Sequence, residues 1–135
     1  MPIQNQALYF IVRSDLESMT GSRAAAQISH AAHQFARNHL AMSDRAVLAW
    51  ENQSNGCGTS IVLKTNDIEQ IKKINYTAQS QRMFANVYCD DSYAVRDGDF
   101  THLVSIITCG HVFIDFNNTD HCNFYDQYLK NLETL

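Results

Sequence analysis

The sequence of 135 residues contains one proline, Pro2, and no repeated or low-complexity segment. The lack of further prolines excludes a proline-rich linker between two domains. With 45% hydrophobic and 18% charged residues, the chain has the composition of a globular protein that buries a core of its own. We therefore predict a single domain that spans residues 1–135.

Long hydrophobic runs are missing as well. The apolar run 7–12 is too short to cross a membrane or to form the core of a secretion signal. The preceding residues 1–6 carry no basic group, which a secretion signal would have. We expect a cytosolic (cytoplasmic) protein that does not associate with membranes.

The sequence has no Cys-x-x-Cys pair. Its cysteines are Cys57, Cys89, Cys109 and Cys122. Such wide spacing favours reduced thiols over a disulfide framework. The segments 109–111 and 121–122 hold enough Cys and His ligands for zinc, so a structural zinc site stays open as an alternative, but the spacing of the usual zinc modules is missing. We expect neither a metal nor a cofactor.

Basic residues are scarce, since 10 Lys and Arg stand against 14 Asp and Glu, and the formal net charge is −4. This balance does not indicate a general nucleic-acid binder, because affinity for phosphates comes largely from cations. The charge is uneven, however. Residues 1–88 hold eight cations and six acids, a balance of +2, whereas residues 89–135 hold two cations and eight acids, a balance of −6. We expect any phosphate-binding surface in the first two thirds of the chain.

The hydrophobic pattern predicts strands and helices in alternation. Strands are expected at 7–12, 59–63, 83–89 and 103–107, with 112–116 as a further strand that would form a hairpin with 103–107 across Cys109 and Gly110. A first helix is expected from Arg23, with Thr20 or Ser22 as its N-cap, and a second over 43–52. A third should begin at a capping box formed by Asn66 and Glu69, and a last helix is expected over 121–134. The segment 90–99 is expected to be an acidic loop. This order favours an α/β three-layer sandwich with helices on both faces of a mixed four- or five-stranded sheet.

The loop 13–23 is the first candidate for a ligand site. It leads from the first predicted strand into the first predicted helix. In open sheets with helical crossovers, ligands bind beyond the carboxyl ends of the strands.

Three stretches around this loop carry a family resemblance. They are Val12-Arg13-Ser14-Asp15-Leu16, then Met19-Thr20-Gly21-Ser22-Arg23, then Ala25-Ala26-Gln27-Ile28-Ser29-His30-Ala31-Ala32. Together they resemble the type-two (archaeal and eukaryotic-type) peptidyl-tRNA hydrolases, whose first helix opens with a similar Ala-Ala-Gln-x-Ser-His-Ala stretch. The order of the remaining elements is also similar to that family, and Trp50 and the stretches 58–64 and 103–107 are similar in position to a short, phage-like branch.

The resemblance implies hydrolysis of the ester that joins a peptide to the terminal ribose of tRNA. It therefore implies peptidyl-tRNA as the partner, and it makes a homodimer an expectation. It also implies a site that combines a loop lysine, an aspartate after the third strand and threonines near the fourth. In this chain Gly21 and Arg23 stand where the family has two loop lysines, and one extra residue lies between Leu16 and Met19. Because a guanidinium stays protonated, an arginine there would act as a fixed electrostatic clamp.

The resemblance leaves the acidic partner open. Asp90 follows the third predicted strand directly and Asp91 is its neighbour, while Asp97 and Asp99 are alternatives if the loop is aligned from the fourth strand backwards. Thr101 matches a family threonine. We expect catalytic roles for Asp90 or Asp91, Thr101 and His30, and binding of tRNA or phosphate by Gly21, Ser22, Arg23, Gln27 and Arg13.

Each of these residues also has a purely structural interpretation. Arg23 would be a solvated residue at a helix start, Asp90 and Asp91 would be turn residues, and His30 would be a hydrogen-bonded residue beside an apolar stripe. At the level of function, the rival hypothesis is a noncatalytic member of the same fold that binds tRNA or another protein, which the missing loop lysine supports. A third hypothesis is a hydrolase of another small acylated or nucleotide substrate.

Overall fold

The computed structural model describes residues 5–135, so Pro2 and the N-terminal segment 1–4 lie outside the described residues. Nine main elements follow one another. They are β1 (Gln6–Arg13), α1 (Gly21–His39), α2 (Arg45–Glu51), β2 (Ser60–Thr65), α3 (Ile68–Ser80), β3 (Ala85–Asp97), β4 (Phe100–Asp115), α4 (Thr119–Phe124) and β5 (Glu133–Thr134). Within the described residues, no helix is both long enough and apolar enough to cross a membrane.

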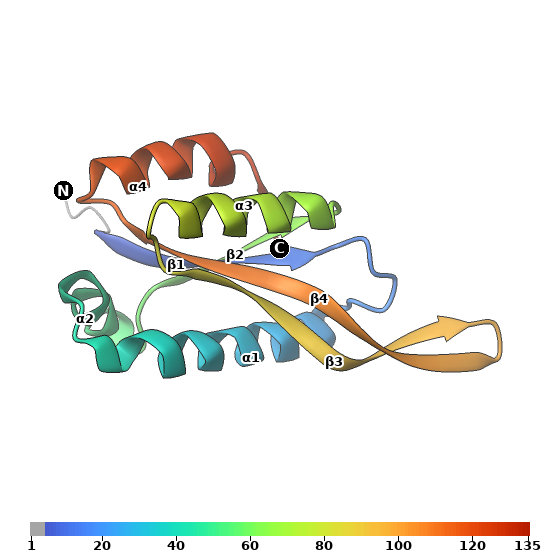
Figure 1. The fold of residues 1–135 in the computed structure, drawn as a ribbon. Helices are drawn as coiled ribbons and strands as arrows, with labels where there is room; N and C mark the ends of the chain where they lie inside the picture. Colours follow the sequence, from blue (N-terminus) through green and yellow to red (C-terminus); the bar gives the residue numbers. More distant parts are fainter. Residues whose placement is uncertain (1–4) are drawn as a thin grey trace.

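The strands form one mixed five-stranded sheet in the order β3-β4-β1-β2-β5 (Figure 1). The central strand β1 runs parallel to β2 and antiparallel to β4. Its residues Ala7 to Val12 are all buried, as expected for an unbroken apolar run between two layers. This confirms the predicted α/β fold with a mixed sheet.

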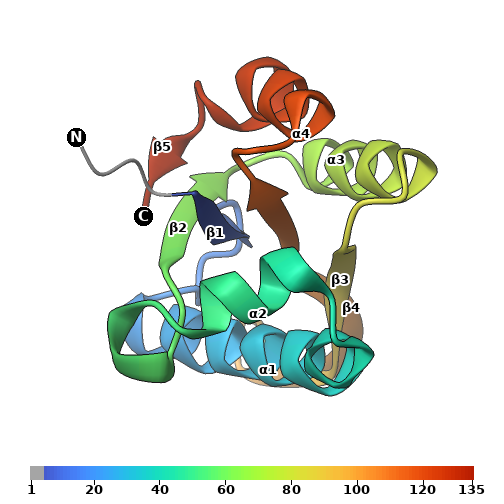
Figure 2. The same cartoon turned by 90° about the vertical axis from the view of Figure 1, so that its left-hand side faces the viewer.

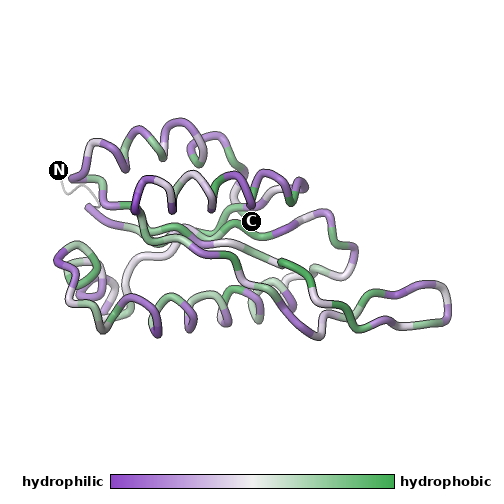
Figure 3. Tube along the Cα trace, in the orientation of Figure 1, coloured by the Kyte–Doolittle hydropathy of each residue, from purple (hydrophilic) through white to green (hydrophobic). Residues whose placement is uncertain are grey.

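Helices cover both faces of the sheet, as Figure 2 shows, with α1 and α2 on one side and α3 and α4 on the other. Alternate residues of β1 supply the two cores: Leu8, Phe10 and Val12 pack toward α1 and α2, whereas Tyr9 and Ile11 pack toward α3 and α4. In Figure 3 the strands between the helix layers are mostly hydrophobic, and the outer turns of the helices are mostly hydrophilic. The three-layer arrangement is therefore as predicted.

The segment 90–99 is not a loop, which corrects the prediction from sequence. Strand β3 continues to Asp97, the chain turns at Gly98 (φ +62°), and β4 pairs back from Phe100. In Figure 1 this hairpin extends beyond the body of the protein. Its outer part is exposed on both faces, so acidic and polar residues are compatible with the strand, and the hydrophobic pattern does not reveal it.

The predicted turn at Cys109 and Gly110 is also wrong, because 103–107 and 112–116 belong to one long strand, β4. Gly110 pairs with Ile11 on β1 and with Val87 on β3. A Cβ at this position would lie 3.0 Å from the Ile71 side chain, so the glycine serves the close packing of α3 on the sheet.

Several helix ends differ from the prediction. Helix α1 has Thr20 at its N-cap position, one of the two predicted residues, but α3 is capped by Asp67, whose carboxylate accepts from the Glu69 amide, and not by Asn66. Helix α2 begins after Asp44, which caps it through two backbone amides. The last helix begins at Thr119, continues through a π-helical turn to Leu129, and gives way to β5.

Candidate active site

Helix α1 presents a row of polar side chains along its length. The row consists of Arg23, Gln27, His30, Gln34 and Arg37, spaced by four, three, four and three residues. This spacing places them on one face of a helix. No acid occurs in residues 21–39, so α1 carries only positive formal charge.

The polar row of α1 lies against strand β3. Arg23 is positioned over the Tyr93 ring, Gln27 donates to Asp90, His30 stacks near Tyr88, and Gln34 has a long contact with the Val87 carbonyl. The helix opening and the segment that begins at Asp90 are thus side by side, as a site that combines a cation of the loop with an aspartate after the third strand would require.

The centre of this arrangement is the side chain of Gln27, which is only 5% exposed. Its Nε2 donates to Asp90 Oδ2 at 2.9 Å, and its Oε1 accepts from Thr108 Oγ1 at 2.7 Å. Because the Thr108 hydroxyl is the donor to Oε1, the amide nitrogen of Gln27 points to the carboxylate. The other oxygen of Asp90, Oδ1, accepts from the Ser92 amide at 2.9 Å. Both oxygens of this half-buried carboxylate are therefore held in place.

Two irregularities in the β3–β4 ladder produce this geometry. Tyr88 pairs with Cys109 and Cys89 with Ile107, so Thr108 is an extra residue on β4. Consecutive residues of a regular strand point to opposite faces, but Thr108 Oγ1 and Cys109 Sγ both contact Gln27, at 2.7 and 3.6 Å. A β-bulge at Thr108 therefore turns its hydroxyl toward α1, and bulges are frequent beside active sites.

The second irregularity lies on the other side of Asp90. Asp90 pairs with Ile106 and Tyr93 pairs with Val104, so β3 has one residue more than β4 in this interval. As a result Asp90 and Tyr93, three residues apart, both face α1, which a regular strand would not allow.

Tyr93 contacts both the start of α1 and the loop before it. The Arg23 guanidinium carbon lies 5.4 Å from the centre of its ring, within cation–π range, and the Tyr93 hydroxyl shares a 2.8 Å hydrogen bond with the Ser18 hydroxyl. Tyr93 also lines a cavity of about 440 Å³ together with Leu16 and Val95. Gly21, Ser22 and Arg23 are all exposed, and nothing would meet a Cβ at Gly21 within 4 Å, so the helix opening is accessible.

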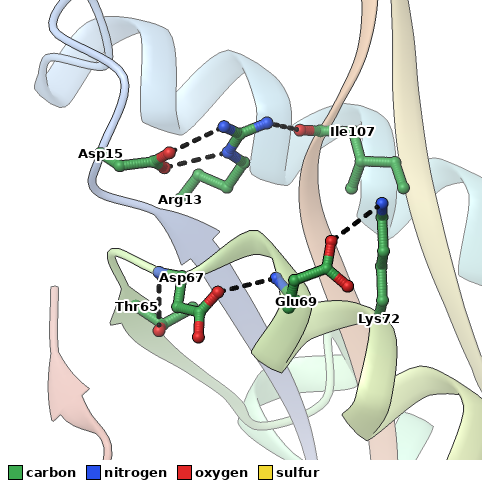
Figure 4. A network of polar contacts seen from close by, with 7 residues as sticks. All are labelled: Arg13, Asp15, Thr65, Asp67, Glu69, Lys72 and Ile107. Atoms are coloured by element: carbon green, nitrogen blue, oxygen red, sulfur yellow. Dashed lines mark hydrogen bonds and ion pairs between the residues drawn. The ribbon is translucent and has the colours of Figure 1, made fainter.

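Arg13 is engaged elsewhere (Figure 4). It donates to both carboxylate oxygens of Asp15, at 2.9 and 2.7 Å, and to the Ile107 carbonyl at 3.1 Å. The hydrogen bonds from Arg13 hold the pKa of the Asp15 carboxyl below its usual value. With its charge balanced by Asp15, Arg13 fastens the end of β1 to β4, and the structure does not bring it into the Gln27–Asp90 group.

Two further predicted residues lie apart from this group. Asp91 is exposed, and its carboxylate accepts only from the neighbouring Ser92 hydroxyl among the contacts of the described residues. Thr101 is exposed and pairs with Arg96 near the hairpin turn. Arg96 is six positions beyond Asp90 on β3, so Thr101 lies roughly 20 Å along the strand from that carboxylate.

His30 stands next to the Gln27–Asp90 group. Its ring centre lies 5.3 Å from that of Tyr88, with 31° between the planes. Burial raises the pKa of Tyr88, and the nearby carboxylates of Asp90 and Asp91 add to this shift. These contacts place His30 on the same side of the sheet as Asp90, beside a tyrosine.

Thr108 is a residue of this group that is not predicted from the sequence. One signal for it exists: a hydroxyl within the apolar run Ile106 to Cys109 must find a partner when the strand is buried. The thiol next to it is an unsuitable nucleophile, because burial raises the pKa of Cys109 to about 12. All four cysteines are free, and the described part of the chain contains no cluster of three or more His, Cys, Asp or Glu side chains suited to a metal ion.

Comparison with known proteins shows the family of the chain. A sequence model of the family described as Peptidyl-tRNA hydrolase PTH2 matches residues 6–106, which include Gln27, Asp90 and the whole of α1. The chain belongs to this family. The match ends at residue 106, so Thr108 lies beyond it.

Among solved structures, the chain resembles a protein of unknown function from Agrobacterium tumefaciens strain C58. The alignment covers 98% of this chain and 99% of that one, with a TM-score of 0.57 and 11% sequence identity. At this identity the likeness concerns the fold alone. A search of curated proteins finds no match.

Proposed function

We propose that this protein hydrolyses the ester bond of peptidyl-tRNA, releasing the peptide and free tRNA. The observation that carries the proposal is the 2.9 Å hydrogen bond from Gln27 Nε2 to Asp90 Oδ2, which holds a carboxylate against the first turns of α1. Membership of the Peptidyl-tRNA hydrolase PTH2 family, matched over residues 6–106, supports this substrate class.

Asp90 is the general base of the proposed reaction. With Oδ2 bound to Gln27 and Oδ1 bound to the Ser92 amide, the carboxylate keeps further lone pairs that can accept a proton from water. The water oxygen attacks the ester carbon and its proton passes to Asp90. The bond between the carbonyl carbon and the ribose oxygen then breaks as Asp90 passes that proton to the ribose oxygen.

The opening of α1 stabilises the negative charge that develops on the carbonyl oxygen. The amides at Gly21 and Ser22 are the first of the helix, where unpaired N–H groups and the helix dipole favour an anion. Arg23 adds a permanent positive charge from the same turn, and its position over Tyr93 keeps it beside β3. Arg23 therefore takes the electrostatic part of a lysine's role without donating a proton.

The test is turnover by the purified chain. With an N-blocked aminoacyl-tRNA as substrate, we expect free tRNA and the blocked amino acid as products, and we expect Asp90→Asn to bind the substrate without releasing them. If the wild-type chain binds the RNA and never cleaves it, the protein is a noncatalytic binding member of the family, and the proposal fails.

Two further expectations accompany this function. The resemblance to the hydrolases makes a homodimer a prediction, which sedimentation of the purified chain can test. A cytosolic location, where peptidyl-tRNA occurs, stays a prediction as well.

A further inference from the structure

The outer part of the β3–β4 hairpin, residues 94–103, is a two-stranded ribbon that extends beyond the rest of the molecule (Figure 1). We call it the outer hairpin. Three of its apolar side chains, Val95, Phe100 and Leu103, are exposed. Because a two-stranded ribbon gains stability from a third strand, these features favour the addition of a strand from a binding partner.

One edge of the sheet is formed by β3, which is the first strand in the sheet order. In the body of the protein, side chains occupy this edge. Gln79 Nε2 on α3 donates to the Ala85 carbonyl at 2.9 Å, and the Val87 amide donates to Asn86 Oδ1 at 2.9 Å. Backbone groups that are bonded in this way are not available to a further strand.

The same edge is open in the outer hairpin. The turn has two residues, so the pair Asp97 and Phe100 that closes it faces inward, and the alternation of an antiparallel ladder turns the backbone N–H and C=O groups of Ala94 and Arg96 away from β4. Among the described residues, no side chain or loop forms a hydrogen bond with these groups. The edge of β3 therefore offers donors and acceptors to an added strand.

We infer that the β3 edge of the outer hairpin binds the peptide of peptidyl-tRNA as an added strand. The ester lies at Asp90 in the proposed reaction, so the C-terminal residue of the peptide lies there, and the peptide runs toward the turn at Gly98, antiparallel to β3. This inference rests on the proposed function, because the ester fixes the start and the direction of the strand. Binding of a peptide can nevertheless be measured without turnover.

Strand addition suits a substrate whose peptide has no fixed sequence. In this mode of binding, hydrogen bonds between main chains supply the affinity, and side chains contribute mainly to specificity. The main chain is the part that peptides of different sequence have in common. The β3 edge would therefore distinguish long peptides from short ones rather than one sequence from another.

A cavity next to this edge provides space for the peptide. It has a volume of about 440 Å³ and lies between the loop before α1 and the outer hairpin. Its lining includes Leu16 and Ser18 of the loop and Tyr93, Val95 and Arg96 of β3. Every second side chain of an added strand would point toward the loop, because successive side chains alternate between the faces of a sheet.

The charge of this part of the chain favours a peptide over a nucleic acid. Residues 90–104 hold four aspartates and one arginine, a balance of −3. Phosphate groups would be repelled here, since nucleic-acid backbones bind to cations. A peptide backbone carries no net charge, and its N–H and C=O groups match the unpaired groups of Ala94 and Arg96.

Kinetics with substrates of two lengths test the inference. Asp90 pairs with Ile106 and Arg96 with Thr101, five positions apart on β4, so a strand of five residues reaches from the ester to Arg96. We expect KM for N-acetyl-pentaalanyl-tRNA to be about five- to tenfold lower than KM for N-acetyl-alanyl-tRNA, the effect of a few backbone hydrogen bonds, with kcat unchanged.

N-methylation of the long peptide gives a matched comparison on the wild-type protein. One substrate is methylated at the second and fourth residues from the ester, and the other at the third and fifth. A strand turns only every second N–H toward its neighbour, so one pattern should remove the advantage of the long peptide and the other should keep KM within about twofold.

Ala94→Pro is the corresponding change in the protein, because proline removes an N–H that points to the open edge and is tolerated at such positions. Leu103→Pro is its control. Leu103 pairs directly with Ala94, so its N–H points to the opposite edge of the ribbon. We expect Ala94→Pro to raise KM for the long substrate to that of the short one, and Leu103→Pro to behave as the wild type. Circular dichroism of both variants checks that they fold.

A peptide that cannot be hydrolysed separates this inference from the proposed function. The probe is fluorescein-labelled pentaalanine joined by an amide bond to 3′-amino-3′-deoxyadenosine. If the wild-type chain binds the probe, Ala94→Pro weakens it and no tRNA ester is cleaved, the strand site stands and the proposed function fails. If the chain cleaves both substrates with equal KM, or the two methylation patterns act alike, the inference is overturned while the proposed function stands.

Discussion

Replacing His111 by leucine should make the protein more resistant to acid. His111 is 2% exposed, and neither of its ring nitrogens has a hydrogen-bond partner among the described residues. Burial lowers its pKa from 6.5 to about 4, and the nearby His39 adds to this effect. Between pH 6.5 and about pH 4, the imidazole of His111 is therefore protonated in the unfolded chain and neutral in the folded chain.

The size of the effect follows from linkage. A pKa difference between 6.5 and about 4 corresponds to about 3 kcal/mol once both states are protonated. Because the folded pKa is depressed, stability is complete above the unfolded value of 6.5 and is lost as the pH falls toward 4. Between about pH 7 and pH 5, this single group should cost about 2 kcal/mol of the free energy of unfolding.

Urea unfolding at a series of pH values measures this loss directly. The wild-type chain should lose about 2 kcal/mol more than His111→Leu between about pH 7 and pH 5, and leucine keeps the side-chain volume close to that of histidine. His33→Gln is the control, because it removes an exposed imidazole instead of a buried one. Parallel stability curves for the wild-type chain and His111→Leu would refute the reasoning.

Two other predictions concern packing and reactivity. Gly58→Ala should cost about 3 kcal/mol in urea unfolding, because φ is +73° and a Cβ would lie 2.3 Å from the Trp50 ring. Gly98→Ala, with φ +62° but no atom within 4 Å of a Cβ, should cost only about 1 kcal/mol, and equal losses would contradict the steric explanation. In alkylation by iodoacetamide followed by mass spectrometry, Cys57 should react in the folded protein, whereas Cys109, whose pKa is raised to about 12 by burial, should react only after unfolding. Modification of Cys109 at the rate of Cys57 would show that the thiol is accessible.

The sequence predicts those parts of the fold that have a strong hydrophobic period. The apolar run of β1 and the three- and four-residue spacing in α1 correctly indicate a strand buried on both faces and a helix packed on it. The hairpin segment 90–102 escapes prediction because its outer part has no core to face, and its acidic residues are typical of a loop. The turn predicted at Gly110 is wrong. This glycine lies within β4, where the absence of a side chain leaves room for Ile71 of α3.

The candidate site, too, could be predicted only in part from the sequence. The resemblance brings Gln27 and Asp90 into consideration, and the structure joins them by a hydrogen bond. Thr108 is not predicted as a site residue. A β-bulge changes the face of the sheet to which a residue points, and the alternation of hydrophobic and polar residues does not reveal where a bulge occurs. The neighbouring carboxylates Asp90 and Asp91 cannot be ranked from sequence for the same reason.

The comparison of Asp90→Asn with Asp91→Asn in single-turnover hydrolysis of peptidyl-tRNA tests the central claim most directly. The two substitutions make the same chemical change at adjacent positions, but only Asp90 is bound to Gln27. We predict that Asp90→Asn slows cleavage by about 10² to 10⁴-fold, the usual contribution of a general base, and that Asp91→Asn stays within about twofold of the wild-type rate. Equal rates for the two variants, or a larger loss in Asp91→Asn, would contradict the assignment of Asp90 as the base.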